Sequence, residues 1–289
     1  MAYLDLMDKS TGFIKPDDVQ EKGKEHQNAY LQAAPFPHVV LDDFLPVELS
    51  DCLLSEFDLR DVQDNPLNET FNRAQERLKR SCHPDTLTPK VRGLFYAFNS
   101  LPFITIIENI TGINGLIPDP YFSGGGLHEI RQGGHLSMHV DFNHHYRMNL
   151  ERRVNVLIYL NKDWKDEYGG QLELWDTAVK TRHHSIVPSF NRCVIFNTSS
   201  GSMHGNPQPI AHPEGTSRKS VALYYYTATW NDQKKSHTTQ FKVRPGSGDR
   251  MDWWVKMQEL KLDYLPPILV RNMTGVMRRL RNGRSPEGQ

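Results

Sequence analysis

Short apolar runs with alternating polar positions dominate the middle of the chain. Residues 152–161 (RRVNVLIYLN), 192–197 (RCVIFN) and 219–230 (KSVALYYYTATW) are typical of buried strands, and 169–176 and 183–188 predict further short ones. Turn residues, and no helical pattern, separate these runs. Five or more short strands in succession predict an antiparallel sandwich or barrel rather than alternating strand–helix units.

Helical periodicity flanks this β-rich part on both sides. Residues 47–58 carry apolar side chains on one helical face, and 88–113 predicts a helix that breaks near Pro102 and is followed by a second helix. Residues 61–85 are polar and predict no definite element. A helical pattern returns after residue 250.

No linker or repeat divides the chain, so we expect residues 1–289 to form one mostly β domain with flanking helices. Its expected parts are a mainly helical N-terminal support (1–118), a β core (119–232) and C-terminal helices (250–283).

Composition and charge narrow the classes of partner. The 34 Lys and Arg balance 34 Asp and Glu, and this zero net charge argues against a general nucleic-acid binder. No apolar run approaches the roughly 18 residues that would cross a membrane, and the first residues do not resemble a secretory signal. Three cysteines without metal-type spacing predict reduced thiols in a cytoplasmic protein. The sequence leaves monomer and homodimer open.

Two His-x-Asp triplets are candidates for metal binding. His83 and Asp85 lie among turn-forming residues, which favours a structural role. His139 and Asp141 instead end an extended run in the β-rich part, where residues i and i+2 project from the same face of a strand. An imidazole and a carboxylate could there occupy neighbouring corners of one metal ion.

A third ligand would come from another strand, and His204 is the best candidate. It follows an apolar strand that runs into a turn of small residues. Seven other histidines compete, and we expect two of them, His144 and His145, to lie in a loop. The competitors are His128, His135, His144, His145, His183, His184 and His212. Two histidines and one carboxylate with open positions are typical of non-haem Fe(II) oxygenases, in which those positions take O₂ and a bidentate co-substrate.

Arg218 opens a strand fourteen residues after His204. A guanidinium matches the far carboxylate of a chelating dicarboxylate better than an ammonium does. Ser220 is expected on the same strand face, and Tyr159 could supply a phenol from a facing strand.

These motifs together resemble the Fe(II)- and 2-oxoglutarate-dependent oxygenases of the prolyl 4-hydroxylase-like superfamily. The matching stretches follow the family order over about 105 residues: GGGLHEIRQGGHLSMHVDFN (124–143), RRVNVLIYLN (152–161), YGGQLELWD (168–176), NRCVIFNTSSGSMHGNPQPI (191–210) and RKSVALYYYTA (218–228). The resemblance implies a double-stranded β-helix core of the jelly-roll or cupin-like kind, with iron held by His139, Asp141 and His204.

The resemblance also implies the co-substrate site. Arg218 and Tyr159, with Ser220 as a further candidate, would hold the 5-carboxylate of 2-oxoglutarate. Arg131 stands near the place where many relatives carry a co-substrate tyrosine, and is a candidate replacement.

The reaction implied is hydroxylation of an unactivated C–H bond, coupled to decarboxylation of 2-oxoglutarate to succinate and CO₂. It consumes O₂, and ascorbate is a candidate reductant. The substrate could be a prolyl or other peptidyl residue, a free amino acid or a small metabolite. The polar loop 141–153 is a candidate substrate lid, and an ordinary solvated loop explains it equally well.

Two alternatives remain. A zinc-type metallohydrolase could use the same two histidines and aspartate with a metal-bound water, but leaves Arg218 and Tyr159 without a role. A non-catalytic β-sandwich binding module should have lost a ligand, and none is missing.

Overall fold

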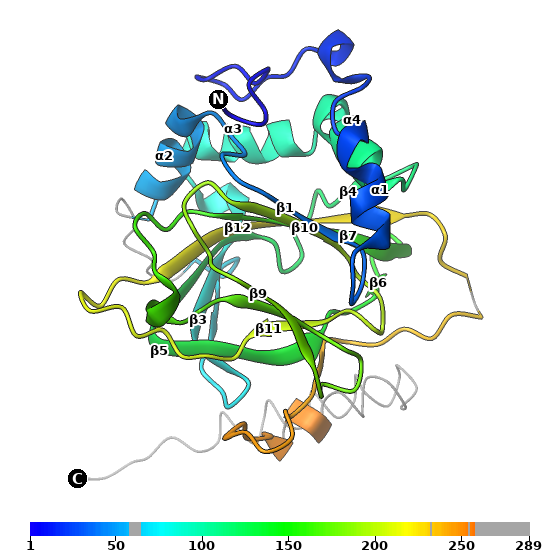
Figure 1. Cartoon of the computed structure of the whole chain (residues 1–289). Coiled ribbons are helices and arrows are strands. Elements are labelled where there is room, and N and C mark those ends of the chain that lie inside the picture. The colour runs from blue at the N-terminus through cyan, green and yellow to red at the C-terminus, as the bar shows by residue number, and fades with distance from the viewer. Residues whose placement is uncertain (58–64, 232, 254, 258–289) are drawn as a thin grey trace.

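The computed structural model describes residues 1–57, 65–231, 233–253 and 255–257. Within this part, antiparallel strands form a curled sheet whose two ends face each other as layers (Figure 1). The strands are β1 (His38–Leu41), β2 (Glu69–Phe71), β3 (Glu76–Cys82), β4 (Ile117–Pro118), β5 (Gly126–Val140), β6 (His144–His145), β7 (Leu150–Tyr159), β8 (Leu172–Trp175), β9 (Arg182–Ile186), β10 (Cys193–Asn197), β11 (Met203–Asn206), β12 (Arg218–Thr227) and β13 (Gln240–Phe241).

Strand β5 joins the two layers. The main path of the sheet runs β1-β10-β7-β12-β5-β11-β8-β9. The first part of β5 pairs with β12, and its last part pairs with β11 and β13. Because β5 belongs to both layers, its final residues lie inside the curl, next to the strands of the second layer.

Helices cover the outer face of one layer. Figure 1 shows α1 to α4 above the layer that contains β1, β10, β7 and β12. The helical segments are η1 (Pro16–Val19), α1 (Lys24–Gln32), α2 (Val47–Ser55), η2 (Pro84–Thr86), α3 (Pro89–Phe98), α4 (Leu101–Thr111) and η3 (Asp166–Tyr168). The predicted break is confirmed, since α3 ends before Pro102 and Pro102 occupies the first turn of α4. A proline is tolerated there because the first amides of a helix have no partner within it.

The largest core lies between these helices and the sheet. Phe98, Phe103 and Ile107 of the helices and Val156 and Tyr225 of the strands are fully buried in one cluster. A second, smaller cluster fills part of the space between the layers and includes Tyr159, Leu174 and Phe196. The fold class is therefore mostly β with helices packed outside, as the sequence predicts.

The N-terminal segment is less helical than predicted. Strands β2 and β3 form a hairpin in the polar stretch that predicts no element, and β3 pairs with β5. The nearly buried side chains of Arg80 on β3 and Glu129 on β5 form an ion pair. A strand whose side chains form ion pairs with the neighbouring strand lacks the alternation of apolar and polar residues by which a sequence predicts a strand. The predicted helices at 250–283 lie almost entirely outside the described residues.

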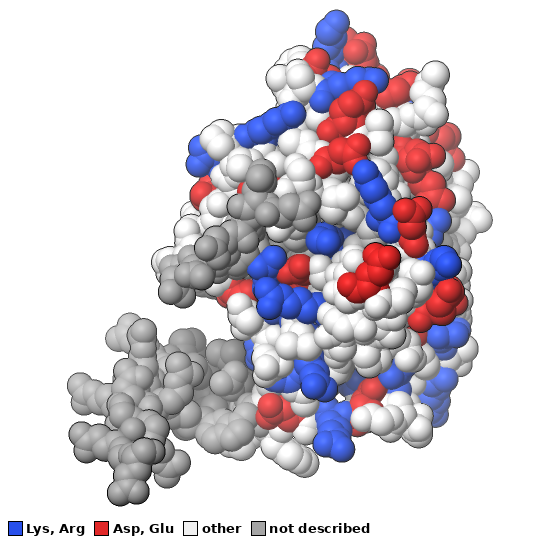
Figure 2. Space-filling view, turned by 90° about the vertical axis from the view of Figure 1, so that its left-hand side faces the viewer, with Lys and Arg blue, Asp and Glu red and all other residues white. Residues whose placement is uncertain are grey.

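Charges of both signs are distributed over the surface. On the face in Figure 2, acidic and basic side chains are interspersed rather than separated into two large fields, in line with the zero net charge. Among the described residues, no helix is both long enough and apolar enough to cross a membrane.

Candidate active site

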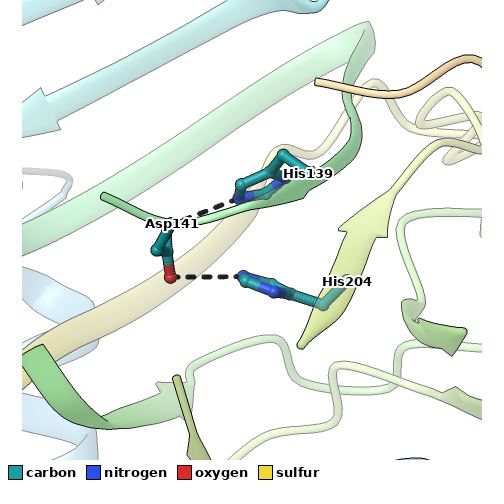
Figure 3. A group of neighbouring side chains, drawn as sticks. All are labelled: His139, Asp141 and His204. Atoms are coloured by element: carbon teal, nitrogen blue, oxygen red, sulfur yellow. Dashed lines mark ion pairs between the residues drawn. The ribbon is translucent and has the colours of Figure 1, made fainter. Parts of the chain in front are cut away.

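Two paired strands bring the predicted metal ligands together. His139 near the end of β5 is directly opposite His204 in β11, so both rings project from one face of the sheet, with centroids 4.4 Å apart. Asp141 follows His139 by two residues and turns toward both rings (Figure 3). One potential ligand atom from each of the three residues lies within 4.8 Å of the others.

The hydrogen bonds of the two histidines leave one nitrogen of each ring available. His139 Nδ1 lies 2.9 Å from the carbonyl oxygen of Ser137, and His204 Nδ1 lies 2.9 Å from that of Ser202. A carbonyl can only accept, so each Nδ1 carries a proton, and in the neutral form of each ring the lone pair is on Nε2. These Nε2 atoms lie 3.6 Å and 3.5 Å from the Asp141 carboxylate oxygens. Two neutral imidazoles and a carboxylate are a suitable donor set for a divalent metal ion.

The charges around the cluster favour the same protonation states. Burial, with a contribution from His139, lowers the pKa of His204 to about 4 and keeps its ring neutral near pH 7. Burial alone would raise the pKa of Asp141, but the charge of Arg152 and the interactions with His204 and His139 together outweigh burial and hold this pKa well below its usual range. Metal ligands must be deprotonated, and both groups are.

Arg152 and Asn155 of β7 fix the Asp141 carboxylate. Arg152 Nη2 and Asn155 Nδ2 donate to Asp141 Oδ2 at 3.1 Å and 2.7 Å. The guanidinium of Arg152 also donates to Asn155 Oδ1 and lies over the rings of Phe142 and Tyr224. The carboxylate is therefore oriented before any metal binds.

The sequence analysis did not identify Arg152 and Asn155 as site residues. In a regular strand, residues three apart face opposite sides. The register between β7 and β12 shifts so that Val154 faces Tyr225 while Arg152 faces Tyr226, and this bulge accompanies the meeting of Arg152 with Asn155. The available signal was weak, because Arg152 is one of three consecutive charged residues in β7 and Asn155 is an amide between two valines.

We predict that Asn155→Ala weakens Fe(II) binding by about 10- to 100-fold, the usual effect of removing a partner that orients a metal ligand. Anaerobic calorimetric titration of the metal-free protein with Fe(II) measures this. Asn109→Ala, which removes donors to loop carbonyls beside α4, should leave the affinity unchanged. Equal affinities in the wild type and Asn155→Ala would contradict the assignment.

Arg218 and Tyr159 form a second cluster between the layers. Arg218 is 5% exposed, and its Nε donates to the Gly170 carbonyl at 2.7 Å while its Nη2 donates to the Tyr159 hydroxyl at 3.2 Å. Burial raises the pKa of Tyr159, so the phenol keeps its proton and can donate it to a further acceptor. No carboxylate in the described part of the chain lies within ion-pair distance of Arg218. A buried guanidinium without a counter-anion is costly, and an anionic ligand would remove that cost.

The pairing of β12 with β5 and β7 places Ser220 and Arg131, the other two candidates for the co-substrate site, on different faces of the sheet. Ser220 is opposite both Tyr159 and His128, so it shares the face of Arg218. Arg131 does not. Its neighbour Ile130 is the residue opposite Arg218, so Arg131 projects from the other face of β5, with 64% of its side chain exposed. The structure therefore does not bring Arg131 to the cluster of Arg218 and Tyr159, and His128 lies on the face of β5 that this cluster shares.

His144 and His145 differ from their predicted loop. They form the short strand β6, which pairs with β7, and His145 is buried. Its Nε2 lies 3.1 Å from Ser123 Oγ and 3.5 Å from Asp119 Oδ1. Neither histidine belongs to the metal-ligand cluster.

Two neutral histidines, the buried His204 and the partly buried His128, predict a dependence of stability on pH. Burial and the charge of Lys79 lower the pKa of His128 to about 3, and that of His204 is about 4, against roughly 6.5 in an unfolded chain. Between about pH 6.5 and 4 the unfolded chain binds protons that the folded protein does not. The free energy of unfolding of the metal-free protein should therefore fall as the pH is lowered through this window.

Urea unfolding at several pH values across the window measures this. His128→Gln should make the decrease shallower, because one of the two groups no longer titrates. The same slope for the variant and the wild type would contradict the prediction.

Comparison with known proteins agrees with these features. Residues 125–226 match the family model for the 2OG-Fe(II) oxygenase superfamily. The mouse prolyl 3-hydroxylase OGFOD1 is 34% identical over 213 residues, which cover 70% of this chain and 37% of that protein. The chain thus spans well under half the length of this curated relative.

A solved structure shares the fold. The prolyl hydroxylase from Trichoplax adhaerens, in complex with a peptide fragment of the hypoxia inducible factor oxygen degradation domain, superposes with a TM-score of 0.52 at 18% identity. The match covers 72% of this chain and 91% of that one. The predicted double-stranded β-helix core is confirmed.

Proposed function

We propose, from the match of residues 125–226 to the model of the 2OG-Fe(II) oxygenase superfamily, that the protein is an iron- and 2-oxoglutarate-dependent hydroxylase. It would couple decarboxylation of 2-oxoglutarate to succinate and CO₂ with hydroxylation of an unactivated C–H bond. His139, Asp141 and His204 would hold the iron, and Arg218 and Tyr159 the distal carboxylate of the co-substrate.

The buried, unpaired guanidinium of Arg218 is the observation that carries this proposal. A metal-ligand cluster alone suits many enzymes, including a zinc hydrolase. A hydrolase that activates a metal-bound water has no use for a cation and a phenol buried in the same fold. A dicarboxylate that chelates the metal through one end needs such a pair for its other end.

The protein contributes positions and protonation states. Bound Fe(II) would supply the activation of O₂. Arg152 and Asn155 hold the Asp141 carboxylate still, and the carbonyls of Ser137 and Ser202 fix the two rings. Apolar side chains between the layers, among them Leu174 and Phe196, keep water away from the co-substrate.

We further propose that the substrate is a prolyl residue in a protein or peptide. The mouse relative is named a prolyl 3-hydroxylase, and the Trichoplax protein is a prolyl hydroxylase that binds a peptide. Ascorbate as a reductant, a cytoplasmic location and the division into 1–118, 119–232 and 250–283 stay predictions from the sequence.

Succinate release tests the proposed function. The protein loaded with Fe(II) and 2-oxoglutarate is screened against proline-containing peptides, free amino acids and small metabolites. Succinate formation that depends on Fe(II), and that a proline-containing peptide stimulates with a 16 Da gain in its mass, is the expected result. Succinate that never exceeds the metal-free background would contradict the proposal.

A further inference from the structure

We propose that Tyr121, Tyr146 and Arg147 form a docking surface for an extended peptide segment that carries a proline beside an acidic residue. We call these residues the rim cluster. The inference deepens the proposed function, on which it rests, because it names the kind of peptide that the site would take.

The rim cluster is a stack of rings with a cation over it. The ring of His145 lies 5.7 Å from that of Tyr121 and 6.3 Å from that of Tyr146, with interplanar angles of 29° and 11°. The guanidinium of Arg147 lies 5.3 Å and 5.8 Å from the two tyrosine rings, and its Nε donates to the Tyr146 hydroxyl at 3.0 Å. Flat aromatic faces and one charge are thus presented together.

This surface is open and its charge is unpaired. Tyr121 is 46% exposed and Tyr146 is 75% exposed, which is unusual for side chains held in a stack. Among the residues that the structure describes, Arg147 forms no ion pair. The hydrogen bond with Tyr146 is the main cause that raises the pKa of Arg147, and Asp119 contributes least. Asp119 is itself buried, accepts from two backbone amides and lies 3.5 Å from His145 Nε2.

The base of this surface is fixed. His145 is buried, its Nε2 contacts Ser123 and Asp119, and its Nδ1 accepts from the amide of Met148. The ring against which Tyr121 and Tyr146 lie is therefore held in place without a ligand. A base that is already ordered adds little entropy cost when a ligand binds.

A chain of contacts links the rim cluster to the metal ligands. Phe142 follows Asp141 directly, and Arg152 lies between the rings of Phe142 and Tyr224. Tyr224 donates to the carbonyl of Gly124, in the turn that also carries Ser123 and Tyr121. A small ligand at the metal would end near Phe142 and Tyr224. An extended peptide advances about 3.3 Å with each residue, so its next residues would reach the rim cluster.

The chemistry of the surface selects the occupant. Proline rings pack against exposed aromatic faces, and a proline-rich segment is already extended before binding. The free guanidinium of Arg147 matches a carboxylate. The rim cluster therefore fits an Asp-Pro or Glu-Pro pair on one side of the target residue.

Fluorescent 15-residue peptides test the proposal. Each has a central proline in a Gly/Ser background and an Asp-Pro pair placed two to seven residues to either side of it, with a matched Asn-Pro peptide for every position. Their affinities for the protein loaded with Fe(II) and 2-oxoglutarate are measured anaerobically by fluorescence anisotropy. We expect one position at which Asp-Pro binds about two- to fivefold more tightly than Asn-Pro, the range of an exposed ion pair.

Variants locate that preference. Arg147→Gln should remove the advantage of Asp over Asn, and Tyr146→Ala should weaken both peptides about tenfold, as loss of an aromatic anchor does. Phe13→Ala, which removes an exposed ring in the N-terminal segment, and Arg92→Gln on α3 should leave both affinities unchanged. Tyr146→Phe, which keeps the ring, should bind like the wild type, and circular dichroism of Tyr146→Ala checks that the alanine variant folds.

Equal affinities for Asp-Pro and Asn-Pro at every position, or an advantage of Asp that persists in Arg147→Gln, would overturn the rim proposal. Peptides that bind through the rim without any Fe(II)-dependent succinate would overturn the proposed function and leave the docking surface in place. The two inferences therefore fail separately.

Discussion

Replacing Arg218 with alanine should raise the apparent KM for 2-oxoglutarate by two or more orders of magnitude while Fe(II) binding persists. The guanidinium is buried and lacks a counter-anion, so the co-substrate carboxylate would complete a buried ion pair. Removing one partner of such a pair costs about 3–5 kcal/mol, because the other charge remains buried. The KM from succinate formation and a direct Fe(II) titration measure the two quantities.

Two further variants make this result specific. Tyr159→Phe removes only a hydroxyl, and should raise the KM about three- to tenfold, the range of one hydrogen bond. Arg192→Ala breaks a pair with Asp42 at the surface and should leave the KM as it is. An unchanged KM in Arg218→Ala would remove Arg218 from the co-substrate site.

Replacing Asp141 with alanine should abolish turnover, whereas the same change at Asp85 should not. Asp141 is the carboxylate between His139 and His204, and its loss leaves two ligands and the uncompensated charge of Arg152. Asp85 belongs to the other His-x-Asp triplet and is exposed, close to the Tyr96 hydroxyl and His83. Succinate formation and Fe(II) titration of the two variants are compared.

Each triplet is therefore a control for the other. Circular dichroism checks that both variants fold. If both lose activity equally while folding is intact, the wrong triplet has been assigned to the metal.

Much of the β core could be predicted because its signal is local. The strands β7, β10 and β12 appear in the sequence as apolar runs between turns, and an His-x-Asp triplet on a strand needs only the two-residue repeat to place both side chains together. Tyr159 and Arg218 also follow from strand positions, and the register of β7 against β12 brings them to one face.

The features that the sequence did not predict depend on pairing between strands that are far apart along the chain. The β2–β3 hairpin is polar because its charges are neutralised by β5, as in the pair of Arg80 with Glu129. Arg131 was expected near the co-substrate, but the pairing of Ile130 with Arg218 turns it to the opposite face. The bulge that accompanies the contact of Arg152 with Asn155 has no signature in one strand alone.

The most direct test of the account is the visible absorption spectrum of the protein with Fe(II) and 2-oxoglutarate under anaerobic conditions. The account predicts a weak charge-transfer band that requires both additions, is lost in Asp141→Ala, and in Arg218→Ala appears only at much higher 2-oxoglutarate concentrations. Wild-type protein that binds Fe(II) but shows no band at saturating 2-oxoglutarate would contradict the claim that these residues hold the metal and the co-substrate together.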